Sequence, residues 1–212
     1  MSETAPSRPP TGYSLVLPPG WLRLPARPGA AEPVLDEALD EAFAGLPRDS
    51  VGPLRAELRR RALALVAEAR FADAVDVYVP LLGVRGRPLP ASVIVAVTTL
   101  PDALSTDLGT DATADAATAG LLSRVAANGR GAVVTLPAGP CARVESHEPP
   151  RDEGEGHGTR RVVFHLPVPF ATQRWVVVNC TVADGLSPMT ETVVDLLDAL
   201  LSTWRWRDGL VL

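Results

Sequence analysis

The sequence contains no lysine, a single isoleucine, two cysteines and few aromatic residues. All 20 of its basic residues are arginine, and aromatic residues make up 5% of the 212-residue chain. With abundant alanine, proline and glycine, this bias is typical of a GC-rich genome and says nothing of mechanism. Apolar runs long enough to span a bilayer are missing, and residues 1–12 lack the apolar core of a signal peptide. We therefore expect a cytoplasmic protein without membrane insertion.

Basic residues are fewer than acidic ones, 20 against 25. The formal net charge is −5 and the isoelectric point is near 5.2, whereas a general nucleic-acid binder needs a positive field to neutralise phosphates. Nucleic acid is therefore not an expected partner. The two cysteines, Cys141 and Cys180, are too widely spaced for a metal-binding pattern. Each lies in a strand-like run, so we interpret both as buried, reduced thiols.

Motifs of high catalytic specificity are missing too. The sequence has neither a Gly-x-Ser-x-Gly nucleophile elbow nor a phosphate-binding Walker motif. The run Gly154-x-Gly156-x-Gly158 has no apolar strand before it and no helix after it, so it is not a dinucleotide-binding fingerprint. We predict no catalytic residue and no cofactor, and we expect a protein that is not an enzyme.

The three histidines are the first place to look for a metal site, because several carboxylates lie near them. Strands are predicted over 141–147 and 160–168, and pairing their apolar faces separates His147 from His165 by several residues at about 3.3 Å each. His157 lies in the acid-rich loop 148–158, which would have to fold back to complete a site. We therefore predict no metal site. The pairing assigns one face to Ala142, Val144, Val162, Phe164, Leu166 and Val168, and the other to Arg143, Glu145, Arg161 and His165.

Two helices of opposite charge are predicted after the first strands. The first begins near Pro33, repeats apolar residues at helical spacing as far as Leu46, and has an acidic outer face. After a connection at 47–53, the second runs over about 54–74 and has an arginine-rich face. Their charges are complementary if the helices lie antiparallel, although apolar burial holds such a pair together.

This helical pair also carries the predicted interaction surface. The ordinary interpretation of charged helix faces is a solvated surface, and the functional one is a docking site for a protein partner. The indole of a tryptophan near the C-terminus is a further possible anchor for a partner. The predicted surface consists of Arg59, Arg60, Arg61, Asp36, Asp40 and Trp206.

The remaining pattern predicts strands with helices grouped between them. Alternating and β-branched runs indicate strands at 13–17, 21–24, 75–81, 92–100, 132–136, 141–147, 160–168 and 174–182. Helices are predicted at about 115–128 and 188–204, the second with Ser187 as N-cap and an apolar stripe from Met189 to Trp204. Pro18-Pro19-Gly20 gives the first strand a corner, and Pro80 indicates an edge strand or a bulge.

This order of elements favours an antiparallel sheet with helices packed on it, because a doubly wound fold needs strict alternation of strands and helices. We predict the α+β class. The expected organisation is a flexible tail at 1–12 and a single domain at 13–212, with the helical hairpin at 33–74 as an insertion.

Two segments carry a resemblance to a known family. They are the corner Leu17-Pro18-Pro19-Gly20-Trp21 and the closing helix that ends in Leu200-Leu201-Ser202-Thr203-Trp204. Together they resemble the PsbP-like fold, whose members include a photosystem subunit, a Ran-binding nuclear-transport factor and mycobacterial lipoproteins of the LpqN type. The helical pair at 33–74 and the missing lipobox depart from that pattern. The resemblance implies a binding or assembly role and carries no functional residue over. The chain is also similar to actinobacterial proteins that we associate with type VII (ESX) secretion.

The leading hypothesis is a non-catalytic protein-interaction module, such as an assembly or secretion accessory factor, with a protein partner. The alternative is a small-molecule-binding protein or an enzyme with a pocket between the helical pair and the sheet. Convergence of His147, His165, Arg143 or Glu145 in such a pocket would support it. A third hypothesis, an immunity-type inhibitor, predicts one tight partner.

Overall fold

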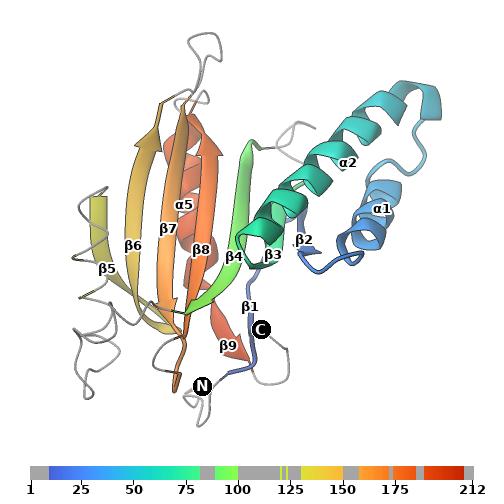
Figure 1. Ribbon diagram of the computed structural model, residues 1–212. Coiled ribbons are helices and arrows are strands. Elements are labelled where there is room, and N and C mark those ends of the chain that lie inside the picture. The colour runs from blue at the N-terminus through green and yellow to red at the C-terminus, as the bar shows by residue number, and fades with distance from the viewer. Residues whose placement is uncertain are drawn as a thin grey trace. The chain divides into compact units, whose positions relative to one another are not determined.

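A computed structural model describes residues 10–81, 89–99, 120, 123, 130–149, 158–171, 174–184 and 189–207 (Figure 1). The chain divides into two compact units. Unit 1 comprises Met1–Val16 and Val97–Leu212, and unit 2 comprises Leu17–Ala96. Strands pair antiparallel in both units and are accompanied by helices, so the fold is of the predicted α+β class. A single domain over 13–212 stays a prediction.

Unit 2 opens with a tight turn. The Trp21 backbone N–H donates to the Pro18 carbonyl over 3.2 Å, and Gly20 has φ +83°, which fits a type II turn with proline at its second position. The turn leads into β2 (Trp21–Pro25), which pairs with β3 (Ala74–Pro80). The prediction that one strand continues through a corner at Pro18-Pro19-Gly20 is wrong, because the preceding strand β1 (Gly12–Ser14) belongs to a different, two-stranded sheet.

β3 is buried on both faces, whereas its alternating sequence predicts a half-buried strand, with an edge position or a bulge at Pro80. Asp76, Val77 and Tyr78 are almost inaccessible to solvent, because β3 pairs with β2 on one side and with β4 (Ala91–Thr99) on the other. Pro80 is the last residue of β3, beyond the register with β4, so its missing N–H breaks no bond there. The predicted irregularity lies at the opposite end of the strand, between Ala74 and Asp76.

The predicted helical hairpin is confirmed, but its two helices begin and end at other residues than predicted. α1 runs over Ala31–Ala42 and α2 over Arg48–Phe71. Gly45, at φ +78°, follows the first helix, so Leu46 is exposed and not on the apolar helix face. The connection predicted at 47–53 is wrong, because α2 continues through Pro53. A proline this close to the helix N-terminus forgoes a single backbone bond.

Apolar side chains of the hairpin pack against the strands of unit 2. Burying one leucine or valine fully contributes about 1.5–3 kcal/mol, so this core holds the hairpin in place. Leu58 and Leu65, predicted on the inner side of α2, are only partly buried, and Ala62 and Val66 lie closer to the centre. The core consists of Leu24, Ala31, Leu35, Leu39, Ala62, Val66, Ala69, Val77, Val79 and Leu81.

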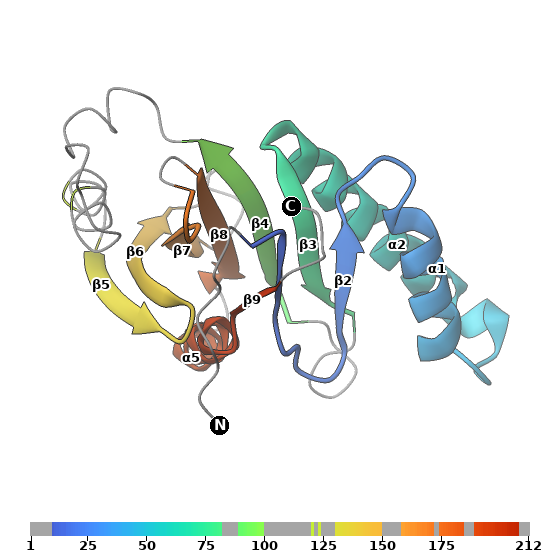
Figure 2. The same cartoon turned by 90° about the horizontal axis from the view of Figure 1, so that it is seen from below.

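Unit 1 contains four antiparallel strands in the order β8-β7-β6-β5. Their bounds are Arg130–Leu136 for β5, Gly139–Glu148 for β6, Thr159–Pro167 for β7 and Arg174–Ala183 for β8. The predicted hairpin of β6 and β7 is confirmed. α5 (Met189–Ser202) lies across one face of these strands (Figures 1 and 2). Its apolar stripe is buried as predicted, except for the exposed Met189 and the partly buried Leu196.

A second, two-stranded sheet lies at the end of α5. β9 (Arg205–Arg207) follows the helix and pairs with β1, with Tyr13 opposite Trp206. The ring of Tyr13 stacks on Trp204 at a centroid distance of 4.2 Å and an interplanar angle of 6°. Trp204 is fully buried, as its place in the predicted stripe indicates. β9 is not predicted from sequence, because three residues show too little alternation.

Some predicted features lie outside the described residues. They are residues 1–9 of the tail predicted at 1–12, the loop at 101–114, most of the helix at 115–128, most of the loop at 148–158 with His157, and the N-cap Ser187. Gly12, the last residue of the predicted tail, belongs to β1. Among the helices that the structure describes, none combines the length and apolarity needed to cross a membrane.

Candidate interaction surface

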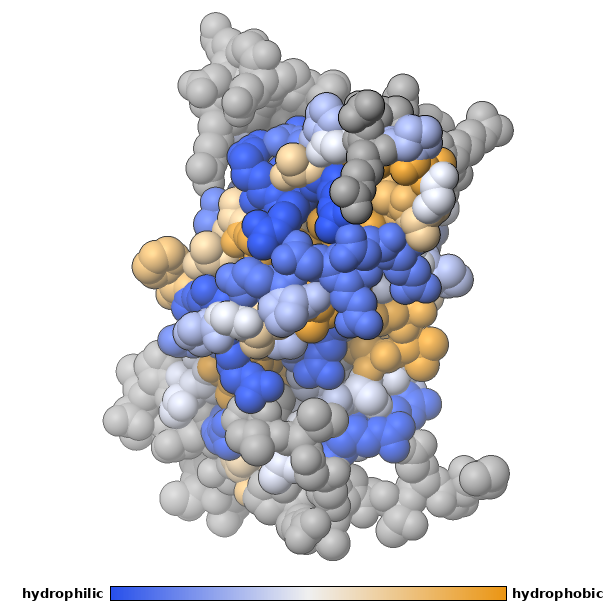
Figure 3. All heavy atoms as spheres, turned by 90° about the vertical axis from the view of Figure 1, so that its right-hand side faces the viewer, coloured by the Kyte–Doolittle hydropathy of each residue, from blue (hydrophilic) through white to orange (hydrophobic). Residues whose placement is uncertain are grey.

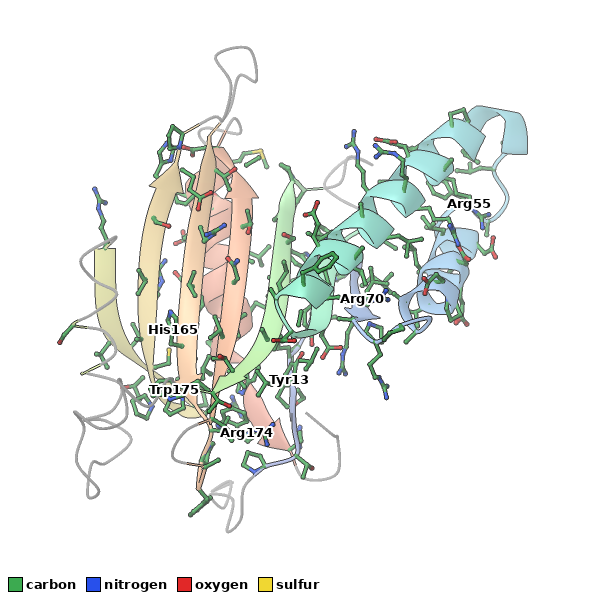
Figure 4. All side chains as sticks on the ribbon, viewed as in Figure 1. Tyr13, Arg55, Arg70, His165, Arg174 and Trp175 are labelled. Atoms are coloured by element: carbon green, nitrogen blue, oxygen red, sulfur yellow. The ribbon has the colours of Figure 1, made fainter. Side chains whose placement is uncertain are left out.

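The seam between α1 and α2 is lined by ion pairs. Arg59 Nε donates to Asp36 Oδ1 over 2.7 Å, and Arg55 Nη1 lies 2.6 Å from Asp40 Oδ1. The order of these pairs reverses along the two helices, so the predicted antiparallel, charge-complementary seam is confirmed. Figure 4 shows Arg55 at the side of α2 that faces α1. The hydrogen bond from Arg59 lowers the pKa of Asp36.

Three residues of the predicted interaction surface are thus engaged within the hairpin. Asp36, Asp40 and Arg59 each have an ion-pair partner on the neighbouring helix. Half-exposed pairs of this kind contribute about 0–1 kcal/mol each, so they set the alignment of the helices more than their stability. Their carboxylates and guanidinium groups are less suited to bind a partner than unshared charges.

Arg60 and Arg61 lie outside the seam and share one carboxylate. Arg60 Nη2 lies 2.8 Å from Glu57 Oε1, and Arg61 Nε donates to the same oxygen. Hydrogen bonds from Arg60 and Arg61 lower the pKa of Glu57 to about 2. The arginine side chains are 68% and 72% exposed. Because two guanidinium groups meet one carboxylate, this part of α2 keeps an excess positive charge.

An exposed stripe continues along α2 from these arginines. Arg60, Ala64, Ala67 and Phe71 are all exposed, and their spacing of four, three and four residues places them on one helix face. Phe71, at the last position of α2, is 93% exposed. We name Arg60, Arg61, Ala64, Ala67 and Phe71 the α2 surface. Figure 3 shows hydrophilic side chains gathered over the face of the molecule that it presents to the viewer, with apolar patches among them.

Arg70 fixes the end of α2 that carries Phe71. Its Nε donates to the Ala26 carbonyl, and its Nη2 donates to the Arg27 carbonyl over 3.0 Å. In Figure 4, Arg70 lies at the end of α2 beside β3. These bonds tie the helix end to the segment that precedes α1. The exposed phenyl ring is therefore presented from a fixed backbone position.

Phe71 is not among the predicted site residues, although its sequence position could have identified it as part of this helix face. It lies eleven residues after Arg60, and this spacing places both on one helix face. A large aromatic residue on the charged face of an amphipathic helix is the signal that identifies it.

Trp206, the sixth residue of the predicted surface, belongs to unit 1, whereas the other five belong to unit 2. It is half-buried, and its Nε1 donates to the Ala138 carbonyl over 3.0 Å. Its ring meets Trp204 edge-on at a centroid distance of 5.5 Å. These contacts give Trp206 a packing role beside β1.

The face assignment predicted for β6 is wrong. Arg143 lies opposite Phe164 and Glu145 lies opposite Val162, so both charged residues share the face of the apolar β7 residues, under α5. Arg143 Nε and Nη2 donate to the Asp198 carboxylate of α5 over 2.8 and 3.0 Å. Ion pairing is what lets charged side chains occupy this face.

A second arginine extends the network under α5. Arg160 Nη1 lies 3.0 Å from Glu145 Oε1 and 2.7 Å from Glu191 Oε1. Burial opposes the charge on Arg143, yet its bonds to Asp198 and Glu145 raise its pKa. Arginines and carboxylates alternate along this network, which locks α5 to β6 and β7.

The remaining groups suited to chemistry are not brought together. His147 Nδ1 lies 2.9 Å from Asp184 Oδ2, while His165 points to the opposite face of the sheet. Burial raises the pKa of Cys141 to about 12 and raises the pKa of Cys180 as well, which makes both thiols poor nucleophiles. Within the described residues, no group of three or more His, Cys, Asp or Glu side chains is placed to hold a metal ion.

The alternative pocket between the helical pair and the strands of unit 2 is not supported. Leu35 and Leu39 of α1 and Val66 of α2 fill that space together with Val77 and Val79 of β3. The four residues expected to converge there, His147, His165, Arg143 and Glu145, all lie in unit 1.

No protein-family model matches the chain, and no curated protein matches it. Among solved structures, it is similar to LpqN, which is involved in cell envelope biogenesis of Mycobacterium tuberculosis. The identity is 12% and the TM-score 0.41, over 93% of this chain and 85% of LpqN. It is also similar to the Ran-binding protein Mog1p of Saccharomyces cerevisiae, with 11% identity and a TM-score of 0.41 over 92% and 90% of the two chains. The link to type VII secretion stays a prediction.

Proposed function

We propose that this chain is a non-catalytic protein-interaction module that binds its partner on the α2 surface. The observation that carries the proposal is the almost complete exposure of Phe71 at one end of that surface. An exposed aromatic ring on a rigid helix gains from burial in a partner, and aromatic residues are frequent anchors of interfaces. The bonds from Arg70 to the backbone of Ala26 and Arg27 keep the helix end in place, so little order has to be created on binding.

The chemistry of the α2 surface defines the partner. Arg60 and Arg61 have one carboxylate between them, so the three groups carry a net positive charge that an acidic group on the partner neutralises. Ala64 and Ala67 are small and exposed, which lets another backbone approach closely. We therefore expect a protein segment with an apolar pocket for Phe71 and acidic residues about three helical turns away, roughly 15–17 Å along the axis, where Arg60 and Arg61 lie.

The finer form of the proposal is an assembly or secretion accessory factor that acts in the cytoplasm. The chemistry described above supports a binding role better than catalysis, because the thiols are buried and the arginine–carboxylate networks are satisfied internally. Cell fractionation of the native host tests the location.

The test is purification of the tagged full chain from its native host, followed by mass photometry of the complex. Wild-type chain is expected to carry a stoichiometric partner, and Phe71→Asp is expected to lose it. Phe170→Asn is the matched control, because Phe170 is an exposed aromatic residue of unit 1. Asparagine also tolerates its φ of +59°. A partner that Phe71→Asp retains in full would overturn the proposal.

A further inference from the structure

β5 is the outermost strand of unit 1 and pairs on one side only. Its residues Arg130–Leu136 lie opposite β6 in an unbroken antiparallel register. Among the strands that the structure describes, none pairs with its other side. Figures 1 and 2 show β5 beyond β6, away from β7 and β8. A strand in this position presents backbone N–H and C=O groups that another strand can bind.

Pro140 of β6 shows which backbone groups of β5 point outward. Residues opposite each other in an antiparallel pair alternate between pairs that exchange backbone hydrogen bonds and pairs that do not. Pro140 has no N–H and lies opposite Thr135, so these two residues form a pair without hydrogen bonds. By alternation, the same holds for Val133 and Gly131 with their partners on β6. The N–H and C=O groups of Gly131, Val133 and Thr135 therefore point away from β6.

The outer edge of β5 is open to solvent. Gly131, Ala132 and Thr135 are exposed, and Val133 is 47% exposed. Within the described part of the chain, no further backbone hydrogen bond reaches the outward groups of Gly131, Val133 and Thr135. These groups are therefore accessible to a strand from another molecule.

β5 also lacks the features that usually protect an edge strand. Natural sheets protect their edges with charged side chains, proline or a β-bulge. β2, the edge strand of unit 2, has Arg23 at its centre and Pro25 at its end. Over its whole length β5 has no proline and no bulge, and its single charged residue, Arg130, stands at the first position. The edge of β5 is therefore suited to pairing, whereas that of β2 is not.

The backbone of β5 is complementary to that of a second copy. Its outward-pointing residues are symmetric about Val133, so two antiparallel copies place Val133 opposite Val133 of the partner subunit. Gly131 then lies opposite Thr135 of the partner subunit. In this register every outward N–H meets an outward C=O of the other copy.

Charge and side-chain size favour the same arrangement. In the antiparallel register the two Arg130 guanidinium groups lie at opposite ends of the paired strands, about 20 Å apart at roughly 3.3 Å per residue. Parallel pairing would place them side by side. The two exposed Val133 side chains form a β-branched cross-strand pair, and Ala132 lies opposite Val134 of the partner subunit. Because the contact is one strand wide, it is smaller than a standard interface, and we expect dissociation in the micromolar range.

We infer that β5 joins two copies of this chain into a symmetric dimer with a continuous antiparallel sheet. The two β5 strands lie side by side at the centre of that sheet, with Val133 at the two-fold axis. The dimer carries two α2 surfaces. Its pairing uses only unit 1, so it does not depend on the proposed function of the α2 surface, which belongs to unit 2.

The test is sedimentation velocity of the full chain at protein concentrations from about 1 to 200 μM, which bracket micromolar dissociation. Wild type is expected to shift from monomer to dimer as the concentration rises. Val133→Lys places two ammonium groups opposite each other and is expected to weaken association at least about tenfold. Val16→Lys is the matched control, because Val16 is an apolar residue of unit 1 that is 70% exposed. It should dimerise like wild type. A wild-type chain that stays monomeric would overturn the inference and leave this edge to a strand of a different protein.

A mixture of two charged variants tests the register. Val133→Glu alone is also expected to associate more weakly than wild type. An equimolar mixture of Val133→Glu and Val133→Lys should associate again, because opposite charges then face each other across the axis. Restoration also shows that both variants are folded. A dimer that survives unchanged in Val133→Lys would overturn the inference. So would a mixture that stays monomeric while both variants keep the far-UV circular dichroism of wild type.

Discussion

Asp76 is a carboxylate enclosed within unit 2, and Arg23 is its bidentate partner. Arg23 Nε and Nη2 donate to the two carboxylate oxygens over 2.8 and 2.7 Å. The Asp76 side chain is 4% exposed, whereas that of Arg23 is 42% exposed. The pair therefore joins the neighbouring strands β2 and β3 at a position where β3 has no exposed face.

Loss of Arg23 is expected to destabilise unit 2. Arg23→Leu leaves the buried carboxylate without its bidentate partner, which costs about 2–3 kcal/mol of the unfolding free energy. Urea unfolding of the two chains measures the difference. The control is Arg23→Leu combined with Asp76→Leu, which removes the buried carboxylate as well. Recovery of stability in the double variant is expected, and a single variant as stable as wild type would contradict the role of the pair.

His165 is expected to make stability depend on pH. Burial lowers its folded-state pKa below the value of about 6.5 for an exposed histidine. As pH falls through 6.5, the unfolded chain takes up a proton that the folded chain does not, so the unfolding free energy falls. The unfolding free energy of wild type minus that of His165→Gln should therefore decrease as pH falls from 8 to 5. A difference that is constant over this range would contradict the burial of this imidazole.

For single residues, the sequence predicts burial in some cases and not in others. Trp204, Cys141 and Cys180 are buried as predicted, because their strand-like or helical neighbourhoods are apolar on the relevant face. The alternation of Asp76 with Val75 and Val77 predicts a half-buried strand. Alternation identifies two faces of a strand but does not reveal that both are covered, which depends on β2, β4 and their neighbours in space.

Among the elements, the ion-paired seam of the helical hairpin was predictable from sequence, and the helix boundaries were not. The opposite charges of α1 and α2 predict an antiparallel pair, and the contacts Asp36–Arg59 and Asp40–Arg55 follow from it. The helix boundary at Pro53 was missed because a proline usually ends the apolar pattern, whereas here the helix starts five residues earlier. Packing of Ala62 and Val66 on the core outweighs that local cost.

The seam is expected to tolerate exchange of its charges. Asp36→Arg alone places two guanidinium groups together and lowers the unfolding free energy, while Asp36→Arg combined with Arg59→Asp restores most of it. The expected coupling energy is below about 1 kcal/mol, because the pair is half-exposed, and it should shrink in high salt. A double-mutant cycle by urea unfolding measures it. Absence of any restoration would contradict a direct pair.

The error in β6 has a simple geometric origin. The predicted faces place Val144 with Val162 and Phe164. The observed register instead places Val144 opposite Val163, on the other face, and brings Arg143 opposite Phe164. Shifting a strand by one residue moves every side chain to the other face. The sequence pattern favours apolar pairing, and the tertiary partner Asp198, 55 residues away, is what makes the observed register acceptable.

For the whole molecule, the order of elements predicts the α+β class because groups of adjacent strands pair most easily antiparallel. The division into unit 1 and unit 2 was not predicted, since it depends on contacts between segments distant in sequence. The proposed function was predictable only as a class. Phe71 and Arg60 share one face of the helix predicted at 54–74, whereas the exposure of Phe71 and the sharing of Glu57 by two arginines are seen only in the folded chain.

Phe71→Asp is expected to leave folding intact. The side chain already lies in water, so the change in unfolding free energy should stay within about 0.5 kcal/mol. Thermal unfolding of the isolated chain, compared with Phe170→Asn, measures this. A large destabilisation would mean that Phe71 stabilises the fold, and the loss of a partner would then have a structural explanation.

The central claim is that the α2 surface binds a protein partner, and site-specific photo-crosslinking in the native host tests it most directly. The photoreactive residue p-benzoylphenylalanine replaces Phe71 in one chain and Phe170 in another. One discrete crosslinked protein is expected from position 71, and it should be lost when Arg60→Glu and Arg61→Glu are combined. No such product is expected from position 170. No product at position 71, or the same products from both positions, would contradict it.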